Sequence, residues 1–425
     1  MNNINYFFKK LKLISKDKNL SRKIIIVLVG LVIFRLLSAI PIPGLDQTAL
    51  ARYFADSDLL GLINISTGGG LSGFSIVMLG AGPYITASII MQVMTIISPK
   101  LKSIQREEGE AGKKKFMQYS RVLTIPLAII QGFSFLILLQ QQGVISPMPA
   151  VEMMTNIIVI TAGAMLVMWI GELITEFGVG NGISLIIFAG IVAGLPGALQ
   201  NLFLTYDQTQ IPALLAMLVV GIVIVLGVVL VTEGERPVPI TYAKQARGGA
   251  QGGISTYLPL RLNQAGVIPI IFALSILMIP SMVANLLGGL TDIRAQLIAG
   301  NINAFISNQL NYGILYFILV FLLTYFYTAV TFDPDDIAKN LQKSGAFIPG
   351  VRPGEQTSKH LGDTLSRITL VGALFLGGIA VLPIIVQSMT GISTITIGGT
   401  ALLIAVSVAI DLVKKIDSQA SMREY

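Results

Sequence analysis

Ten apolar stretches run through this 425-residue chain, and they limit its possible folds more than any other feature. Each is long enough to cross a hydrocarbon core of about 30 Å as a helix. The stretches are Ile24–Ile40, Ile76–Ile97, Val122–Leu139, Val151–Ile170, Ile183–Leu204, Ile211–Val231, Leu262–Leu287, Leu310–Val330, Ile368–Val386 and Ile392–Ile410. The sequence therefore predicts an all-α polytopic membrane protein with ten transmembrane helices.

The basic residues predict the orientation of these helices. If the spans alternate from an inside N-terminus, 26 of the 29 Lys and Arg residues fall on the inner side. They lie before Arg35, from Lys100 to Arg121, from Arg236 to Arg261, from Lys339 to Arg367, and from Lys414 onward. Because cytoplasmic loops carry the excess of Lys and Arg, we expect both termini in the cytoplasm. The net charge of +7 then reflects these loops and requires no nucleic-acid partner.

The first apolar stretch follows a basic lead-in that contains Lys9, Lys10 and Lys12. A secretory signal peptide starts in the same way, but nine further spans follow here and an A-x-A-like cleavage pattern is missing. We interpret the segment as a retained first helix, preceded by a basic amphipathic helix on the membrane surface.

Five spans in each half would make the halves inverted relative to each other. Residues 1–205 would form the first half and residues 206–425 the second. A P-x-I-x-A pattern recurs at matching places, in the second span at Pro83–Ala87 and in the seventh at Pro269–Ala273. Glycines precede both prolines, so we expect both helices to begin or break there. Ordinary Gly/Pro kinks of membrane helices would leave the same pattern.

Ionisable residues are almost absent from the spans. Carriers of ions and small solutes usually keep Asp, Glu, His or Arg near the midplane, so an inverted-repeat secondary transporter is the weaker alternative. The chain has no Cys and a single histidine, His360, which falls in a predicted cytoplasmic loop. We therefore predict no catalytic residue, no metal site and no cofactor, which also argues against a membrane-embedded enzyme.

Aliphatic side chains remain along the broken helices: Ile85 in the second span, Ile183 and Ile187 in the fifth, and Ile271 in the seventh. A ring of such residues would dewet a narrow pore and block ions. Core packing of these isoleucines is the other interpretation. The glycine-rich segment 62–73 is apolar but a poor helix former, and we expect it to be re-entrant and movable.

Several motifs together resemble the SecY family, the channel-forming subunits of the bacterial Sec protein translocase. They are Ile40–Gly44, Pro83–Ile90, Gly180–Ser184, Ala265–Pro269 and Lys343–Thr357, and the resemblance extends over essentially the whole chain. It implies a central subunit of the channel that moves unfolded secretory polypeptides across the cytoplasmic membrane and releases apolar segments into it.

The resemblance assigns roles to particular positions. The pore ring falls on Ala81, Ile85, Ile183, Ile187, Ile271 and Ile404, and Ala81 departs from the bulky aliphatic residue usual there. The plug falls on Ile63, Asn64, Ile65, Ser66, Thr67, Gly68, Gly69, Gly70, Leu71 and Ser72. A small Ala81 would leave more of the seal to the other ring residues and the plug.

The family's lateral gate opens between the second and third spans on one side and the seventh and eighth on the other. The polar residues at matching places are Thr86, Gln92, Gln131 and Asn263. Buried amides can hold such a seam closed with about 1 kcal/mol each, although they equally serve to hold neighbouring helices together. A hydrophobic signal helix would open the seam.

The resemblance also implies partners. The cytoplasmic loops 232–261 and 332–367 would receive the SecA motor and the ribosome, with Arg236, Lys244, Arg247 and Arg352 as the charges involved. Topology or anionic phospholipid would also explain basic residues in such loops. The small subunits SecE and SecG, signal sequences and nascent polypeptides complete the expected set, in a bacterial cytoplasmic membrane.

Overall fold

The computed structural model describes residues 17–43, 74–106, 108–141, 143, 145–204, 211–242, 255–289, 292–390 and 394–421. Structural statements below concern these residues. The predicted plug, the basic lead-in before residue 17, Lys244 and Arg247 lie outside them.

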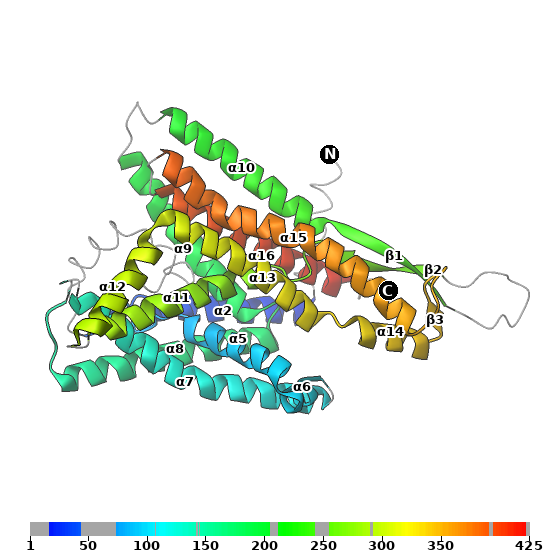
Figure 1. Ribbon diagram of the computed structural model, residues 1–425, viewed down its shortest axis with the longest axis horizontal. Coiled ribbons are helices and arrows are strands. Elements are labelled where there is room, and N and C mark those ends of the chain that lie inside the picture. Colours follow the sequence, from blue (N-terminus) through cyan, green and yellow to red (C-terminus); the bar gives the residue numbers. More distant parts are fainter. Residues whose placement is uncertain are drawn as a thin grey trace, which may run out of the picture.

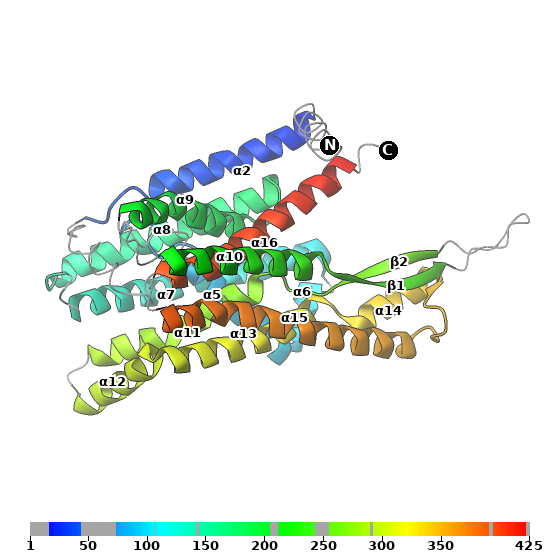
Figure 2. The same cartoon turned by 90° about the horizontal axis from the view of Figure 1, so that it is seen from above.

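Long helices form a bundle (Figures 1 and 2). Within the described residues ten of them each overlap one of the ten apolar stretches. They are α2 (Lys18–Leu37), α5 (Gly82–Ile97), α7 (Gly109–Gln141), α8 (Ala150–Phe177), α9 (Gly182–Leu204), α10 (Ile211–Glu233), α11 (Ile268–Gly288), α13 (Gln309–Thr331), α15 (Glu355–Thr390) and α16 (Thr394–Ser421). The predicted fold of ten membrane helices is therefore confirmed.

Length and composition alone identify five of the described helices as able to cross a membrane: α7, α8, α11, α15, and the run Gln309–Lys343 that contains α13. Helix α5 passes the same test only together with α6 (Pro99–Arg106), from which it is bent by 116°. The apolar side chains that point outward from the bundle, such as Ile158 and Leu226, are more than half exposed. A bundle that shows aliphatic residues on its outside requires lipid around it.

Helices α5 and α11 begin where the sequence predicts a break. Pro83 and Pro269 occupy the first turn of their helices, and the preceding Gly80 and Gly266 have φ angles of 52° and 63°. These positive φ values are the left-handed region that glycine enters freely, so the chain turns before each helix starts. Helix α11 consequently begins six residues after the start of its predicted apolar stretch.

Three short strands add a sheet that the all-α prediction did not include. Strands β1 (Glu235–Tyr242), β2 (Ser255–Arg261) and β3 (Ala346–Phe347) form an antiparallel sheet in the order β2-β1-β3. Prolines at 237 and 239 prevent a helix, while Val238 and Ile240 alternate with them and are buried. The sheet has a small core of its own, in which Val238 packs with Leu260 and Leu361.

One end of the bundle carries the sheet, α6, α14 (Pro334–Lys343), the start of α2 and the end of α16, as Figure 2 shows. The helix α12 (Ile293–Ser307) lies at the other end. Among the described residues, every Lys and Arg except Arg35 and Arg294 lies at or towards the first end. The charge asymmetry expected from the sequence is thus present in space.

The main core lies where the two groups of five helices meet. A single apolar cluster takes Phe34 and Ile85 from the first group and Ile271, Tyr316 and Ile404 from the second. Helix α9 contacts α16, and α11 contacts both α5 and α7, so the interface places the broken helices side by side at the centre.

Candidate functional site

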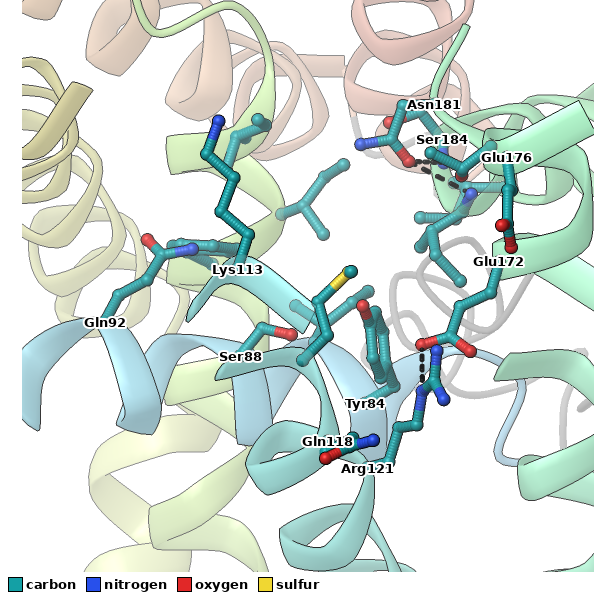
Figure 3. A pocket seen from close by; sticks show the side chains of 18 of the residues that line it. Tyr84, Ser88, Gln92, Lys113, Gln118, Arg121, Glu172, Glu176, Asn181 and Ser184 are labelled. Atoms are coloured by element: carbon teal, nitrogen blue, oxygen red, sulfur yellow. Dashed lines mark hydrogen bonds and ion pairs between the residues drawn. The ribbon is translucent and has the colours of Figure 1, made fainter. Parts of the chain in front are cut away.

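A cavity of about 730 Å³ opens between α5, α7, α8, α9, α11 and α13 (Figure 3). Four of its charged lining residues, Glu110, Lys113, Lys114 and Glu176, are exposed, whereas Ile85, Ile187 and Ile271 at its other limit are 4%, 1% and 5% exposed. The cavity therefore runs from a polar mouth at the basic end of the bundle to an aliphatic base at its centre. Water fills such a mouth readily but is excluded from a base without polar groups.

The six residues assigned to the pore ring meet in the main core. Ala81, Ile85, Ile187, Ile271 and Ile404 are all buried in one cluster, and the half-buried Ile183 packs against it. They come from α5 and its N-cap, α9, α11 and α16, which represent both helix groups. The same cluster holds many other aliphatic residues, so burial by itself does not separate a ring from core packing, and the ring stays a prediction.

A tight turn between α8 and α9 positions Ile183 and Ile187, the two residues of α9 that are assigned to the ring. A Cβ at Gly182 would overlap the carbonyl oxygen of Gly171, so only glycine permits the two helices to approach this closely. The Asn181 side chain then caps α9 by accepting hydrogen bonds from the backbone N–H groups of Ile183 and Ser184 at 3.1 and 3.3 Å. The motif Gly180–Ser184 thereby directs Ile183 towards the cavity.

An ion pair supports the wall of the mouth. Arg121 Nε of α7 donates to Glu172 Oε1 of α8 at 2.8 Å, and the Glu172 side chain is only 14% exposed. Both residues line the cavity, and Figure 3 shows them pointing towards each other. The sequence does not indicate this pair, because the partners are 51 positions apart and only the helix packing brings them together.

The polar residues assigned to the lateral gate do not contact one another across its two sides. Gln131 Nε2 donates to Thr86 Oγ1 at 3.4 Å, but this contact joins α7 to α5, which lie on the same side of the expected seam. Gln92 Oε1 is buried without a hydrogen-bond partner among the described residues. Asn263 precedes α11 and donates to the Gly266 carbonyl at 3.1 Å, which closes a local turn.

Other residues join the two sides of the seam. Ser134 Oγ of α7 donates to the Met282 carbonyl of α11 at 3.2 Å, and Gln141 Nε2 donates to the Asn285 carbonyl at 3.5 Å. Sequence reasoning missed both contacts, because their acceptors are backbone carbonyls and carry no residue-specific signal.

The described docking residues lie at the basic end of the molecule. Arg236 on β1 and Arg352 before α15 are exposed, and the Arg352 carbonyl accepts a hydrogen bond from Thr357 at 2.9 Å. Ser358 of α15 donates to Asp335 of α14, which fixes the two helices under the sheet. The long motif Lys343–Thr357 thus forms a rigid corner with an exposed cation.

No group of three or more His, Asp and Glu side chains in the described part of the chain is arranged to hold a metal ion. The cavity has a polar entrance and an aliphatic base, and its residues bring no reactive group to that base.

These features define a multi-pass helical membrane protein built around a central cavity whose base is lined by buried aliphatic side chains. The sequence model of SecY matches residues 75–413, and the chain belongs to the SecY family.

The relatives and solved structures agree with that membership. The chain is 42% identical to the protein translocase subunit SecY of Synechocystis (94% of this chain, 92% of the relative) and 39% identical to that of Thermotoga maritima (96% and 95%). A structure described as that of a protein conducting channel matches with a TM-score of 0.66 at 18% identity, covering 96% of this chain and 94% of the other. Sec61 in the canine ribosome-channel complex from the endoplasmic reticulum matches with a TM-score of 0.62, at the same identity and the same coverage. At this identity the two structures show the shared fold.

Proposed function

We propose that this chain is the channel-forming subunit of a bacterial Sec translocase, which moves unfolded secretory polypeptides across the cytoplasmic membrane and releases apolar segments sideways into the lipid. The observation that carries the proposal is the central cavity whose base consists of buried isoleucines from both helix groups. The relatives named as translocase subunits support it at about 40% identity over nearly their full length.

The aliphatic base would act as the seal of the resting channel. Ala81, Ile85, Ile183, Ile187, Ile271 and Ile404 form the proposed pore ring, and residues 63–72 form the proposed plug on its outer side. A dry constriction of this kind excludes hydrated ions, because no group replaces their water shell. An extended polypeptide passes by displacing side chains that offer no specific contact to hold it.

The seam between α7 and α11 would be the lateral gate. Thr86, Gln92, Gln131 and Asn263 are the proposed gate residues from the sequence, and Ser134 and Gln141 are added by their hydrogen bonds to α11. Interhelical hydrogen bonds in membranes contribute about 0.6 kcal/mol on average. An apolar signal helix of about 20 residues therefore gains enough in lipid to part the seam.

The proposed orientation places both termini, the sheet and α14 in the cytoplasm of a bacterial cell. Residues 1–205, with the plug and an amphipathic N-terminal helix, are the first inverted half, and residues 206–425, with both docking loops, are the second. Arg236, Lys244, Arg247 and Arg352 are proposed to bind the SecA motor and the ribosome, and the likeness to Sec61 in a ribosome-channel complex supports the latter. SecE, SecG, signal sequences and anionic phospholipid are the remaining proposed partners.

Site-specific crosslinking tests the proposal. A secretory precursor is stalled during import into inverted membrane vesicles that carry photoreactive residues at Ile85, Ile187 or Ile271. The control position is Leu226 on α10, which is 57% exposed on the outside of the bundle. We expect crosslinks to the precursor from the three cavity positions and none from Leu226.

A precursor that engages the vesicles but crosslinks to none of the three isoleucines would contradict the proposal. The isoleucines would then be core packing, and the alternative of a small-solute transporter would return. That alternative needs ionisable groups near the midplane. The charged residues of this cavity lie at its mouth instead.

A further inference from the structure

The mouth of the cavity carries equal numbers of opposite charges. Three basic residues, Lys113, Lys114 and Arg121, and three acidic residues, Glu110, Glu172 and Glu176, line it. Their formal charges cancel, although the chain as a whole carries a net charge of +7 and its excess of basic residues lies at this end. Local neutrality at the entrance is therefore a property of this site and does not follow from the surrounding surface.

Two of the six charges neutralise each other within the wall. Arg121 and Glu172 form the 2.8 Å ion pair between α7 and α8. Lys113, Lys114, Glu110 and Glu176 are exposed, and none forms an ion pair within the described part of the chain. These four charges remain available to a molecule in the cavity.

The free acidic residue Glu176 lies on a different wall from the free lysines, whereas Glu110 shares α7 with them. Figure 3 shows Lys113 of α7 on one side of the cavity, and Glu176 of α8 on the other side beside Asn181 and Ser184. A charged side chain that leaves bulk water for a narrow cavity is stabilised only if an opposite charge is near. The walls of this cavity therefore offer an opposite charge to acidic and to basic side chains alike.

We propose that Lys113, Lys114, Glu110 and Glu176 are specificity-determining residues that make the entrance tolerant of both acidic and basic polypeptide segments. The inference rests on the proposed function and names a property of its substrates. A mouth of one sign would retain segments of the opposite sign and repel those of its own. The balanced mouth neither retains nor repels segments of one sign more than those of the other, so segments of both signs reach the aliphatic base with similar occupancy.

Charge reversal at the mouth tests this inference. Three precursors differ only in a run of four Asp, four Lys or four Ser residues, and a folded C-terminal domain stalls each with the run in the cavity. A photoreactive residue at Met117, which lines the cavity, reports occupancy as crosslink yield in inverted membrane vesicles. The measured quantity is the ratio of the Asp-run yield to the Lys-run yield.

We expect a ratio near one for the unchanged protein. Glu176→Lys should raise the ratio at least threefold, and Lys113→Glu should lower it at least threefold. The double variant should return the ratio to its starting value. The matched control is Lys115→Glu, because Lys115 lies on the same helix, pairs with Glu108 at 3.0 Å and does not line the cavity.

Unchanged ratios in both single variants, or shifts in the same direction, would overturn the inference. An equal shift in Lys115→Glu would also overturn it, since the general surface charge would then be responsible. The Ser-run precursor separates the two proposals. If it fails to crosslink in the unchanged protein, the proposed function fails, whereas crosslinking of this precursor with an invariant ratio rejects only the charge tolerance.

Discussion

At the scale of single residues, glycines determine how closely the central helices approach. A Cβ at Gly163 of α8 would overlap the carbonyl oxygen of Ile76, in the turn that leads to Ala81 and α5. Gly171 and Gly182 meet in the same way at the turn into α9. Small residues at such crossings let two backbones touch, which membrane bundles use in place of a hydrophobic driving force.

Gly163→Ala should therefore destabilise the protein. The new methyl group has no space beside the Ile76 backbone, and overpacking of this kind costs about 1–3 kcal/mol. The measurement is the temperature at which half of the protein has lost its monodisperse state in detergent, monitored by size-exclusion chromatography. We expect this midpoint temperature to decrease by several degrees. Gly194→Ala is the control, because no atom lies within 4 Å of its added Cβ. Equal midpoints for the two variants would show that the close approach at Gly163 is not needed.

At the scale of elements, α7 and α11 form a seam that few polar contacts hold closed. The contacts from Ser134 and Gln141 both end on backbone carbonyls near the C-terminal half of α11. The Gln141 side chain packs against Gly288 and Gly289, and its atoms lie at ordinary van der Waals distances of 3.4–3.7 Å from the positions that Cβ atoms would take there. In the proposed lateral gate, such a seam would be stable in the resting state and still weak enough for a signal helix to open.

The double variant Ser134→Ala with Gln141→Met should lower the hydrophobicity that a signal sequence needs for translocation. Loss of both hydrogen bonds removes about 1 kcal/mol from the closed seam, which corresponds to about a fivefold gain in open population. We expect a similar gain in translocation of a precursor with a shortened apolar signal, measured by protease protection in vesicles. Thr155→Ala is the control, since this hydroxyl donates only to the Val151 carbonyl of its own helix. If the control gains as much, the seam contacts are not responsible.

At the scale of the whole molecule, the two helix groups create a site that neither contains alone. The base of the cavity is formed by Ile85 and Ile187 from the first group and Ile271 from the second. The proposed seal therefore depends on the interface between the groups, and movement of one group against the other would change its width.

Replacing Ile85, Ile187 and Ile271 together with Asn should raise the ion conductance of the resting channel. Asn side chains hydrate the constriction and remove the barrier that a dry aliphatic segment imposes on ions. Planar bilayers with the purified protein give the measurement, and we expect at least a tenfold rise in resting conductance. The triple replacement by Val is the control, because it keeps the constriction apolar. Resting conductance that is equal for Asn, Val and the unchanged protein would contradict the ring assignment.

Much of the fold was predictable from local patterns. The ten apolar stretches predicted the long helices, and Gly266 with Pro269 predicted the start of α11, because glycine and proline act on the backbone within one turn. The sheet was not predicted, since Val238 is buried against Leu260 and Leu361, which are distant in sequence.

The sequence by itself determined the class of protein, its membrane spans and its family, because hydrophobicity, charge asymmetry and motif spacing are properties of short segments. Only the tertiary structure decided which polar residues meet. It paired Arg121 with Glu172, connected Ser134 to α11, and left the carbonyl oxygen of Gln92 without a partner among the residues that the structure describes. The physical reason is that hydrogen bonds and ion pairs act over a few ångströms, so they depend on helix packing that no local pattern specifies.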